Sequence, residues 1–407
     1  MSMPRSVLRQ ALFGWVHFAL AAPGIYLWLG LPLVMRQHGW SGTEIGIFQL
    51  AGLPAVFKLV FALPVQRWRP GRHPERHWAW LSGAGYLLAL LGLAWLGIDA
   101  HKGVLFTLTL LAALFATWTD IPVSALTMQV FPPQERPLAG AVRSAVTFAG
   151  AVVGGGVMLL VQQWLGWSAP FLILGVCLLA ALALLGLVQE DSSAPGMQGL
   201  PSIAAWHGFF RQPGAGGWTL ALLGFFPFVA AAWIYLKPLL LDRGLPASGV
   251  ALIAGVGGGA LGALASIATG LLPRERMQAA LSMSAVANAI ALALMAAAAA
   301  YATAPWLIAA AVVLAIAMGV ASSLVFGLMM EFSRSSLRAL DYGLQASLFT
   351  CSRILATSLA GLLLDQWGYP GMLTALALAS LPITLAMLMC FTQQRSSHSR
   401  YSSHAGS

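Results

Sequence analysis

The chain has 407 residues, of which 59% are hydrophobic and only 8% are charged, and its mean hydropathy is +0.81. These values exceed what the core of a soluble domain needs, so they exclude a soluble globular protein and indicate an integral membrane protein. The net charge of +9 is explained by basic loops, as described below, and gives no support to nucleic-acid binding.

Uncharged runs of about 20 residues are long enough to cross roughly 30 Å of hydrocarbon as helices. The sequence contains twelve such runs, and little polar chain is left outside them. We predict an all-α membrane protein with helices at 11–35, 43–65, 78–98, 103–129, 138–162, 168–188, 217–241, 247–272, 277–299, 305–330, 342–364 and 371–392. The first run is too long for a cleaved signal and is expected to be the first span.

Orientation is predicted from the 21 Lys and Arg residues, because short cytoplasmic loops retain basic residues during insertion. With the N-terminus inside, fourteen of them fall in inner segments and only Arg36, Lys102 and Arg243 fall in outer loops. Both termini are therefore expected to be cytoplasmic.

The longest polar stretch, 189–216, divides the chain into two sets of six spans. We predict an N-terminal bundle at 1–188, a cytoplasmic linker at 189–216, a C-terminal bundle at 217–392 and a cytoplasmic tail at 393–407. Within the linker, Ile203 to Arg211 is either a short amphipathic helix on the membrane surface or an irregular segment.

The two halves carry similar short motifs at a constant separation. PPQER ends at Arg136 and RSSLR ends at Arg338, while WLGW contains Gly166 and DQWGY contains Gly368; both pairs are 202 residues apart. A single offset across two markers indicates duplicated six-span halves with a pseudo-twofold axis along the membrane normal. Such halves enclose a central cavity.

Five charged residues lie at least four residues inside the ends of the predicted spans, where ionised side chains are costly and mark functional positions. Lys58, Asp120 and Arg353 lie deep, although Lys58 and Asp120 could also form a purely structural ion pair. Arg143 and Lys237 lie closer to span ends and could instead extend to the headgroups. Four cations facing one acid predict a cavity that holds an anionic ligand.

Helical spacing places other candidates beside these charges. Phe349 and Gln345 share a face with Arg353, and Trp233 and Phe226 share one with Lys237, so a cation and a ring could together hold an anionic aromatic ligand. The alternative is that these rings are packing or interfacial residues.

Two residues are candidates for proton coupling. Asp120 shares a polar face with Thr117, Ser124 and Thr127, which would be wasted on lipid. His17 aligns with Trp28, a further candidate ligand contact, and His17 either relays protons or is a hydrogen-bonded packing residue.

Several chemistries are not supported. The chain has no phosphate-binding loop, and the glycines of Gly257 to Gly262 lie inside a span, where they favour close helix packing. The three cysteines are scattered, so we expect no metal site, no cofactor and no enzymatic activity.

The twelve spans in two repeated halves resemble the major facilitator superfamily of secondary transporters. ALPVQRWRPGR (Ala62 to Arg72) resembles the loop signature of that superfamily, with Ala62 and Gln66 in place of its Gly and Asp. The muropeptide permease branch of the superfamily is resembled by two runs in the last spans, DYGLQASLF and SRILATSLAGLLLDQWGYPGM. The RhtX/FptX-type siderophore permeases are resembled by the run from Thr119 to Ser144, TDIPVSALTMQVFPPQERPLAGAVRS.

The resemblance implies a monomeric importer of an iron–siderophore complex, such as ferric pyochelin, in a bacterial inner membrane. We expect alternating access, coupled to protons through Asp120. The alternatives are a permease for muropeptides or other anionic metabolites, a drug efflux pump and an intramembrane transferase. A transferase would need a base and a partner, and only His17 and Asp120 are available.

Overall fold

The computed structural model describes residues 5–98, 101–190, 203–301 and 303–404, and these form helices joined by short loops. Eleven helical stretches within this part of the chain are long and apolar enough to cross a membrane. The last of them, Arg338–Met389, is broken at Gly368, where φ is 65°, and therefore makes two crossings. Twelve crossings and an all-helical membrane fold confirm the prediction.

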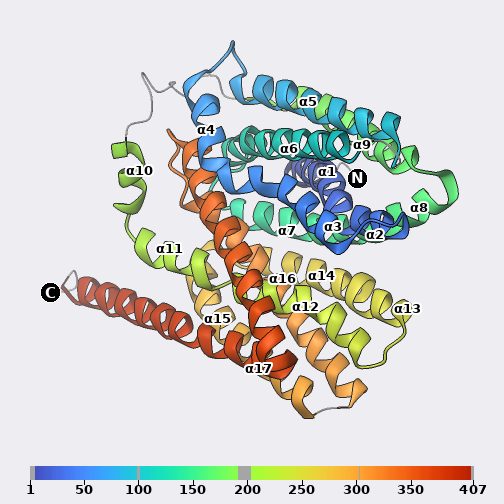
Figure 1. Cartoon of the computed structure of the whole chain (residues 1–407). Coiled ribbons are helices and arrows are strands. Elements are labelled where there is room, and N and C mark those ends of the chain that lie inside the picture. Colours follow the sequence, from blue (N-terminus) through green and yellow to red (C-terminus); the bar gives the residue numbers. More distant parts are fainter. Residues whose placement is uncertain (1–4, 99–100, 191–202, 302, 405–407) are drawn as a thin grey trace.

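The first six crossings occupy the upper part of Figure 1. They consist of the following helices in chain order: α1 (Arg5–Ile25), η1 (Tyr26–Gly30) and α2 (Leu31–Gln37); α3 (Gly42–Gln49), η2 (Leu50–Phe57) and α4 (Lys58–Arg67); α5 (Pro74–Leu96); α6 (Lys102–Val130); α7 (Arg136–Val152), η3 (Val153–Val157) and α8 (Met158–Leu165); α9 (Ser168–Leu184) and η4 (Leu185–Leu187). We refer to them as the N-terminal half.

The other six crossings occupy the lower part of Figure 1, and we refer to them as the C-terminal half. Their helices are α11 (Ala215–Gly224) and α12 (Pro227–Asp242); α13 (Ala247–Val250), η5 (Ala251–Gly257) and α14 (Gly258–Gly270); η6 (Arg274–Arg276) and α15 (Met277–Tyr301); α16 (Ala304–Glu331); and α17 (Arg338–His404), which continues past the predicted end at 392.

Part of the predicted linker, 191–202, lies outside the described residues. The part that is described contains α10 (Ile203–Phe210), so the short helix forms where the sequence allowed either a helix or an irregular segment. Arg334 holds this helix through a 2.8 Å hydrogen bond from Nη2 to the Ala205 carbonyl.

The repeat is visible in the backbone. Arg136 and Arg338, which are 202 residues apart, both begin helices. Gly166 and Gly368, at the same offset, both have positive φ (85° and 65°) and nearly identical ψ (−178° and −176°). A side chain is disfavoured in this conformation, so glycine is needed at both turns. The two halves thus share local geometry as well as short motifs.

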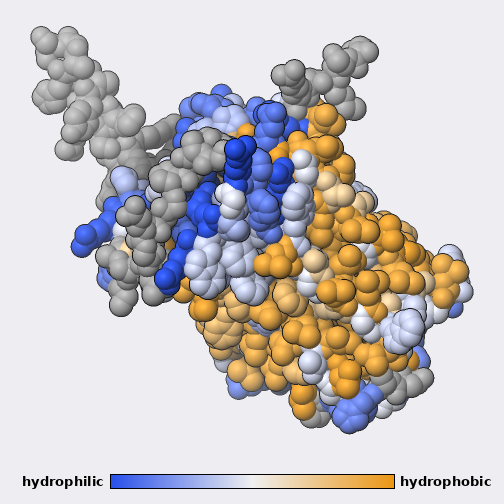
Figure 2. Space-filling model, turned by 90° about the horizontal axis from the view of Figure 1, so that it is seen from above, coloured by the Kyte–Doolittle hydropathy of each residue, from blue (hydrophilic) through white to orange (hydrophobic). Residues whose placement is uncertain are grey.

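One end of the molecule carries most of the basic loop residues, and we call it the basic face; the opposite end is the far face. Figure 1 shows the basic face on the left, where α4 ends and α10 lies. Figure 2, seen from above, shows hydrophilic residues gathered at this end and a broad hydrophobic surface to the right. That surface is what contact with the hydrocarbon of a membrane requires.

Glycines let the two halves approach closely near the basic face. A side chain at Gly140 of α7 would collide with the backbone of Gly327 in α16, and one at Gly270 would collide with Ala141. Further along, Gly259 and Gly262 face Val152 and Phe148, which agrees with the close packing expected for this glycine run.

Candidate functional site

Three helices of the N-terminal half bring three of the predicted charged residues together. Lys58 is the first residue of α4 and follows the 3-10 segment that contains Pro54, Asp120 lies in α6, and Arg143 lies in α7. All three lie well inside their crossings, away from the loops. The sequence could not place them side by side, because they come from three separate spans.

The Asp120 carboxylate accepts hydrogen bonds from both cations. Lys58 Nζ lies 2.6 Å from Oδ2, and Arg143 Nη2 lies 2.7 Å from Oδ1 and 3.0 Å from Oδ2. Arg143 Nη1 also donates to Ser124 Oγ at 2.6 Å. With two cations and one carboxylate, the group keeps an excess of one positive charge.

The fourth member of the site, Tyr342, was not among the predicted residues. It belongs to α17 in the C-terminal half, and its hydroxyl donates to Asp120 Oδ2 at 2.6 Å and accepts from Arg143 Nη2 at 2.5 Å. We call Lys58, Asp120, Arg143 and Tyr342 the Asp120 cluster. A tyrosine near the start of a span resembles an ordinary interfacial residue, so the amino-acid sequence carried no signal that Tyr342 contacts Asp120.

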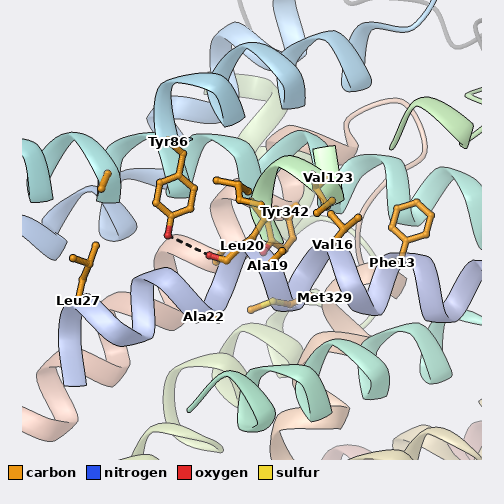
Figure 3. Close-up of a cluster of buried hydrophobic side chains, with 14 of the residues drawn as sticks. Phe13, Val16, Ala19, Leu20, Ala22, Leu27, Tyr86, Val123, Met329 and Tyr342 are labelled. Carbon is orange, nitrogen blue, oxygen red and sulfur yellow. Dashed lines mark hydrogen bonds between the residues drawn. The ribbon is translucent and has the colours of Figure 1, made fainter. Parts of the chain in front are cut away.

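The ring of Tyr342 is 2% exposed and joins a hydrophobic cluster that includes residues of α1. Figure 3 shows it among Val16, Ala19 and Leu20, with Met329 nearby. Its ring also lies under both cations, 5.2 Å from the Arg143 guanidinium carbon and 5.6 Å from Lys58 Nζ. Tyr342 therefore joins the two halves through both its ring and its hydroxyl.

The described hydrogen bonds between the halves lie from the Asp120 cluster toward the basic face. Besides those of Tyr342, they run from Leu59 N to Ser347 Oγ (2.8 Å), from Gln66 Nε2 to the Ser336 carbonyl (2.9 Å), from Arg136 Nη1 to the Met330 carbonyl (3.3 Å) and between the hydroxyls of Ser144 and Ser266 (2.8 Å). These contacts close the basic face.

Arg353 lies on the far-face side of this closure. It follows Tyr342 by eleven residues, which is about three helical turns and a rise of about 16 Å, so the two side chains project from the same face of α17. The residue as a whole has an exposed surface, and no residue that the structure describes pairs with its guanidinium. An arginine without a partner in a membrane span is a candidate ligand contact.

An aromatic path leads from the Asp120 cluster along the C-terminal half. The Arg143 guanidinium carbon lies 4.8 Å from the centre of the Phe326 ring. Phe326 and Phe349 have ring centres 6.3 Å apart, and Phe349 and Phe226 have centres 5.1 Å apart. Phe226 is only 5% exposed, whereas Phe349 is half-buried and is the better placed of the two for a ligand.

Gln345 does not lie where a ligand could bind it in this conformation. It is completely buried, its Oε1 accepts from Trp218 Nε1 at 2.7 Å, and its Nε2 has acceptors at Ser333 Oγ (3.1 Å) and at the Met329 and Asp341 carbonyls. Its amide is fully used within the C-terminal half. Both ends of the amide are therefore engaged inside the protein in this conformation, and the ligand contact stays a prediction.

None of the remaining candidates is hydrogen-bonded or ion-paired to the Asp120 cluster among the described residues, although His17 lies close enough to interact electrostatically with its charges. Trp233 packs against Gly258, and Trp28 packs against Gly52. Lys237 is exposed, without a partner among the described residues, and lies five residues from the end of α12. His17 is 5% exposed, and its Nε2 lies 3.4 Å from Thr127 Oγ1, which suits the packing alternative. Among the described residues no group of three or more His, Cys, Asp or Glu side chains is arranged to hold a metal ion.

Comparison with known proteins agrees with this architecture. The anhydromuropeptide permease of Escherichia coli K12 is 26% identical over 210 residues, which cover 48% of this chain and 42% of that protein. A bacterial homologue of the iron transporter ferroportin, in an outward-facing state, superposes with a TM-score of 0.74 at 15% identity over 93% of this chain and 98% of its own. The transporter FucP, in the outward conformation, superposes with a TM-score of 0.72 at 14% sequence identity, over 94% of this chain and 99% of its own.

A family model described as the Major Facilitator Superfamily matches residues 13–357, which is most of the chain. The fold with its twelve crossings and the residues of the match agree with each other and with the expectation drawn from the sequence. The chain belongs to the Major Facilitator Superfamily, and it is a multi-pass membrane transporter for a small molecule, not an enzyme.

Proposed function

We propose that this transporter imports an anionic organic ligand across a bacterial inner membrane by alternating access. The observation that carries the proposal is the charge of the described groups: Lys58 and Arg143 share the single carboxylate of Asp120, and Arg353 has no described partner, so the four charges sum to plus two. Charges in a membrane span are costly unless they are compensated, so a ligand that brings negative charge is favoured there.

The ligand site of this proposal lies between the two halves. Its floor is the Asp120 cluster, where the side chains of Lys58 and Asp120 each keep 15% exposure although the basic face beneath them is closed. Arg353 lies about 16 Å further toward the far face. We place the basic face in the cytoplasm, together with both termini, because basic loops are retained there. On this placement the closed basic face is the cytoplasmic side.

The leading substrate is a ferric siderophore, as the resemblance to the siderophore permeases implies. Its acidic groups suit the positive site, and the exposed part of Phe349 offers a ring for stacking. The second candidate is an anhydromuropeptide, favoured by the match with the Escherichia coli permease, although that match spans less than half of either chain. Proton uptake by Asp120 is part of the proposal for both.

Uptake of labelled substrates in a deletion strain tests the proposal. We expect the strain that carries the gene to accumulate either iron-labelled ferric pyochelin or a labelled anhydromuropeptide, and the deletion strain to lose that accumulation. A protonophore should abolish it as well. Equal uptake of both compounds with and without the gene would refute both substrate assignments. Uptake of a lipophilic cation instead would refute an anionic ligand.

A further inference from the structure

The hydroxyl of Tyr342 occupies a position with a defined hydrogen-bonding requirement. Arg143 can only donate, so the phenol oxygen accepts from Arg143 Nη2 and its single proton goes to Asp120 Oδ2. A group at this position must therefore donate one hydrogen bond to a carboxylate and accept one from a guanidinium. An alcohol, a phenol or a protonated carboxyl group can do both. An ionised carboxylate cannot, since it would lie 2.6 Å from Asp120 with no proton between them.

The same hydroxyl is a contact between the halves. Lys58, Asp120 and Arg143 all belong to the N-terminal half. Tyr342 belongs to the C-terminal half, and its hydroxyl is hydrogen-bonded to Asp120 and Arg143. The other described hydrogen bonds between the halves do not involve the Asp120 carboxylate. Whatever replaces the Tyr342 hydroxyl at Asp120 thus removes the described hydrogen bonds between the charged group and the C-terminal half and leaves the contact of Arg143 with the Phe326 ring.

A ligand can approach this position, because the Lys58 and Asp120 side chains remain partly exposed while Tyr342 itself is buried. On this basis, and resting on the proposed transport function, we propose that the Tyr342 hydroxyl marks a subsite for an un-ionised hydroxyl group of the ligand. The ligand hydroxyl takes the place of the phenol between Asp120 and Arg143. An acidic ligand enters the subsite with its proton, and no bond other than hydrogen bonds is made or broken.

The exchange couples binding to opening of the basic face. While the phenol occupies the subsite, the halves are hydrogen-bonded beside Asp120. Once the ligand occupies it, that contact is lost and parting of the basic face becomes more favourable, although the other hydrogen bonds between the halves must also break. In this scheme the empty transporter stays closed at the basic face, and a molecule without a suitable hydroxyl does not trigger the transition. Arg353 attracts the negative charge of the ligand, and Asp120 and Arg143 recognise the ligand hydroxyl by hydrogen bonds.

Distances across the basic face test the release step in purified protein. Spin labels are placed at Arg72→Cys and Arg276→Cys, which are exposed loop positions in the two halves, with Cys177, Cys351 and Cys390 replaced. Tyr342→Phe keeps the ring and removes only the hydroxyl. We expect the population with separated labels to rise about tenfold without any ligand, the effect of losing one hydrogen bond to a charged group.

The matched control is Tyr86→Phe, because the Tyr86 hydroxyl bonds to the Leu20 carbonyl (3.5 Å), as drawn in Figure 3, and so stays within the N-terminal half. This variant should show the wild-type distances. If Tyr342→Phe also shows them, the phenol does not hold the halves together and the release step is wrong.

Small probes test the subsite directly, without transport. In Tyr342→Ala reconstituted in nanodiscs, phenol should bind about tenfold more tightly than toluene, which fills the same space without a hydroxyl. Benzoate should bind more weakly than phenol at neutral pH and improve as the pH falls. Equal binding of phenol and toluene in this variant would show that no hydroxyl subsite exists.

These outcomes are separate from those of the uptake assay. A phenol preference without uptake of either labelled substrate would contradict the proposed substrates and leave the subsite standing. Uptake without a phenol preference, and with unchanged distances in Tyr342→Phe, would contradict the subsite alone.

Discussion

Arg143 and Gln345 occupy corresponding positions in the two halves, at the same 202-residue offset as the repeated motifs. Both are buried, yet they are used differently. Arg143 binds Asp120 and crosses to Tyr342 in the other half, whereas Gln345 bonds only to Trp218 and to other groups of its own half. The repeat preserved the helix position and changed its chemistry.

The difference extends to the other membrane-buried charges. The N-terminal half holds Lys58, Asp120 and Arg143 in one mutually paired group, while Arg353 of the C-terminal half has no partner among the described residues. Paired charges at a junction suit a structural and switching role, because separating them exposes uncompensated charge. An unpaired arginine suits a ligand contact. On the proposed function, the comparison predicts that the paired group serves closure and that Arg353 serves ligand attraction.

Asp120→Asn should have the largest effect, because it leaves Lys58 and Arg143 without a negative partner. Breaking a buried ion pair in this way costs about 3–5 kcal/mol. We expect a large loss of thermal stability in detergent and loss of uptake. Asp242→Asn is the control, since this exposed carboxylate bonds Tyr369 at the surface and should change stability by at most about 0.5 kcal/mol. Equal melting curves for the two variants would contradict a structural role for the paired charges of the N-terminal half.

Arg353→Ala should separate binding from stability. With no described partner to lose, the protein should unfold like the wild type, while the apparent KM for the ligand should rise roughly tenfold or more, as expected for a lost charged hydrogen bond. Lys237→Ala removes a second span cation that has no partner among the described residues; it lies near the end of its helix, so the change in KM should be smaller. A larger effect at Lys237 would move ligand attraction to α12.

Gly140→Ala tests whether closure depends on contact between the halves. The new methyl group would collide with the Gly327 backbone, so we expect a cost of about 1–3 kcal/mol and a greater distance between labels on the basic face. Gly156→Ala, where no atom lies within 4 Å, is the control. Unchanged label distances in Gly140→Ala would mean that the halves do not need this contact to close.

Glu190→Gln should have the smallest effect on transport, because the described contacts of Glu190 are with the N-terminal half. Glu190 accepts hydrogen bonds from the Glu75 and Arg76 backbone amides at 2.9 and 3.2 Å. Burial, together with the neighbouring Glu75 carboxyl, raises the pKa of Glu190 from 4.5 to about 8. The folded protein therefore binds this proton more tightly than the unfolded chain, and its stability decreases as the pH rises from about 4.5 to about 8.

The slope from one such group is at most about 1.4 kcal/mol per pH unit. Glu190→Gln keeps the oxygen acceptor and should flatten the unfolding profile over this interval, as measured by melting temperature against pH. The uptake rate should follow the wild type. A profile that keeps its slope would show that another group carries the proton.

The sequence by itself determined that this is a membrane protein, that it crosses the membrane twelve times and that its halves repeat. A bilayer requires long apolar helices, and the lengths of the apolar runs can be counted in the sequence. It also identified Lys58, Asp120, Arg143 and Arg353, since a charge within an apolar span is conspicuous wherever it points. It did not identify Tyr342, and it assigned Gln345 to the ligand, because neither residue type reveals its partners.

Only the tertiary structure decided which charges meet. Lys58, Asp120 and Tyr342 are separated by 62 and 222 residues, so no local pattern relates them, and their contact arises from how the helices pack. Packing likewise satisfied the amide of Gln345 and left Arg353 without a described partner. Helix formation follows from local chain chemistry, whereas the pairing of side chains across helices depends on the rotation and depth of each helix in the bundle.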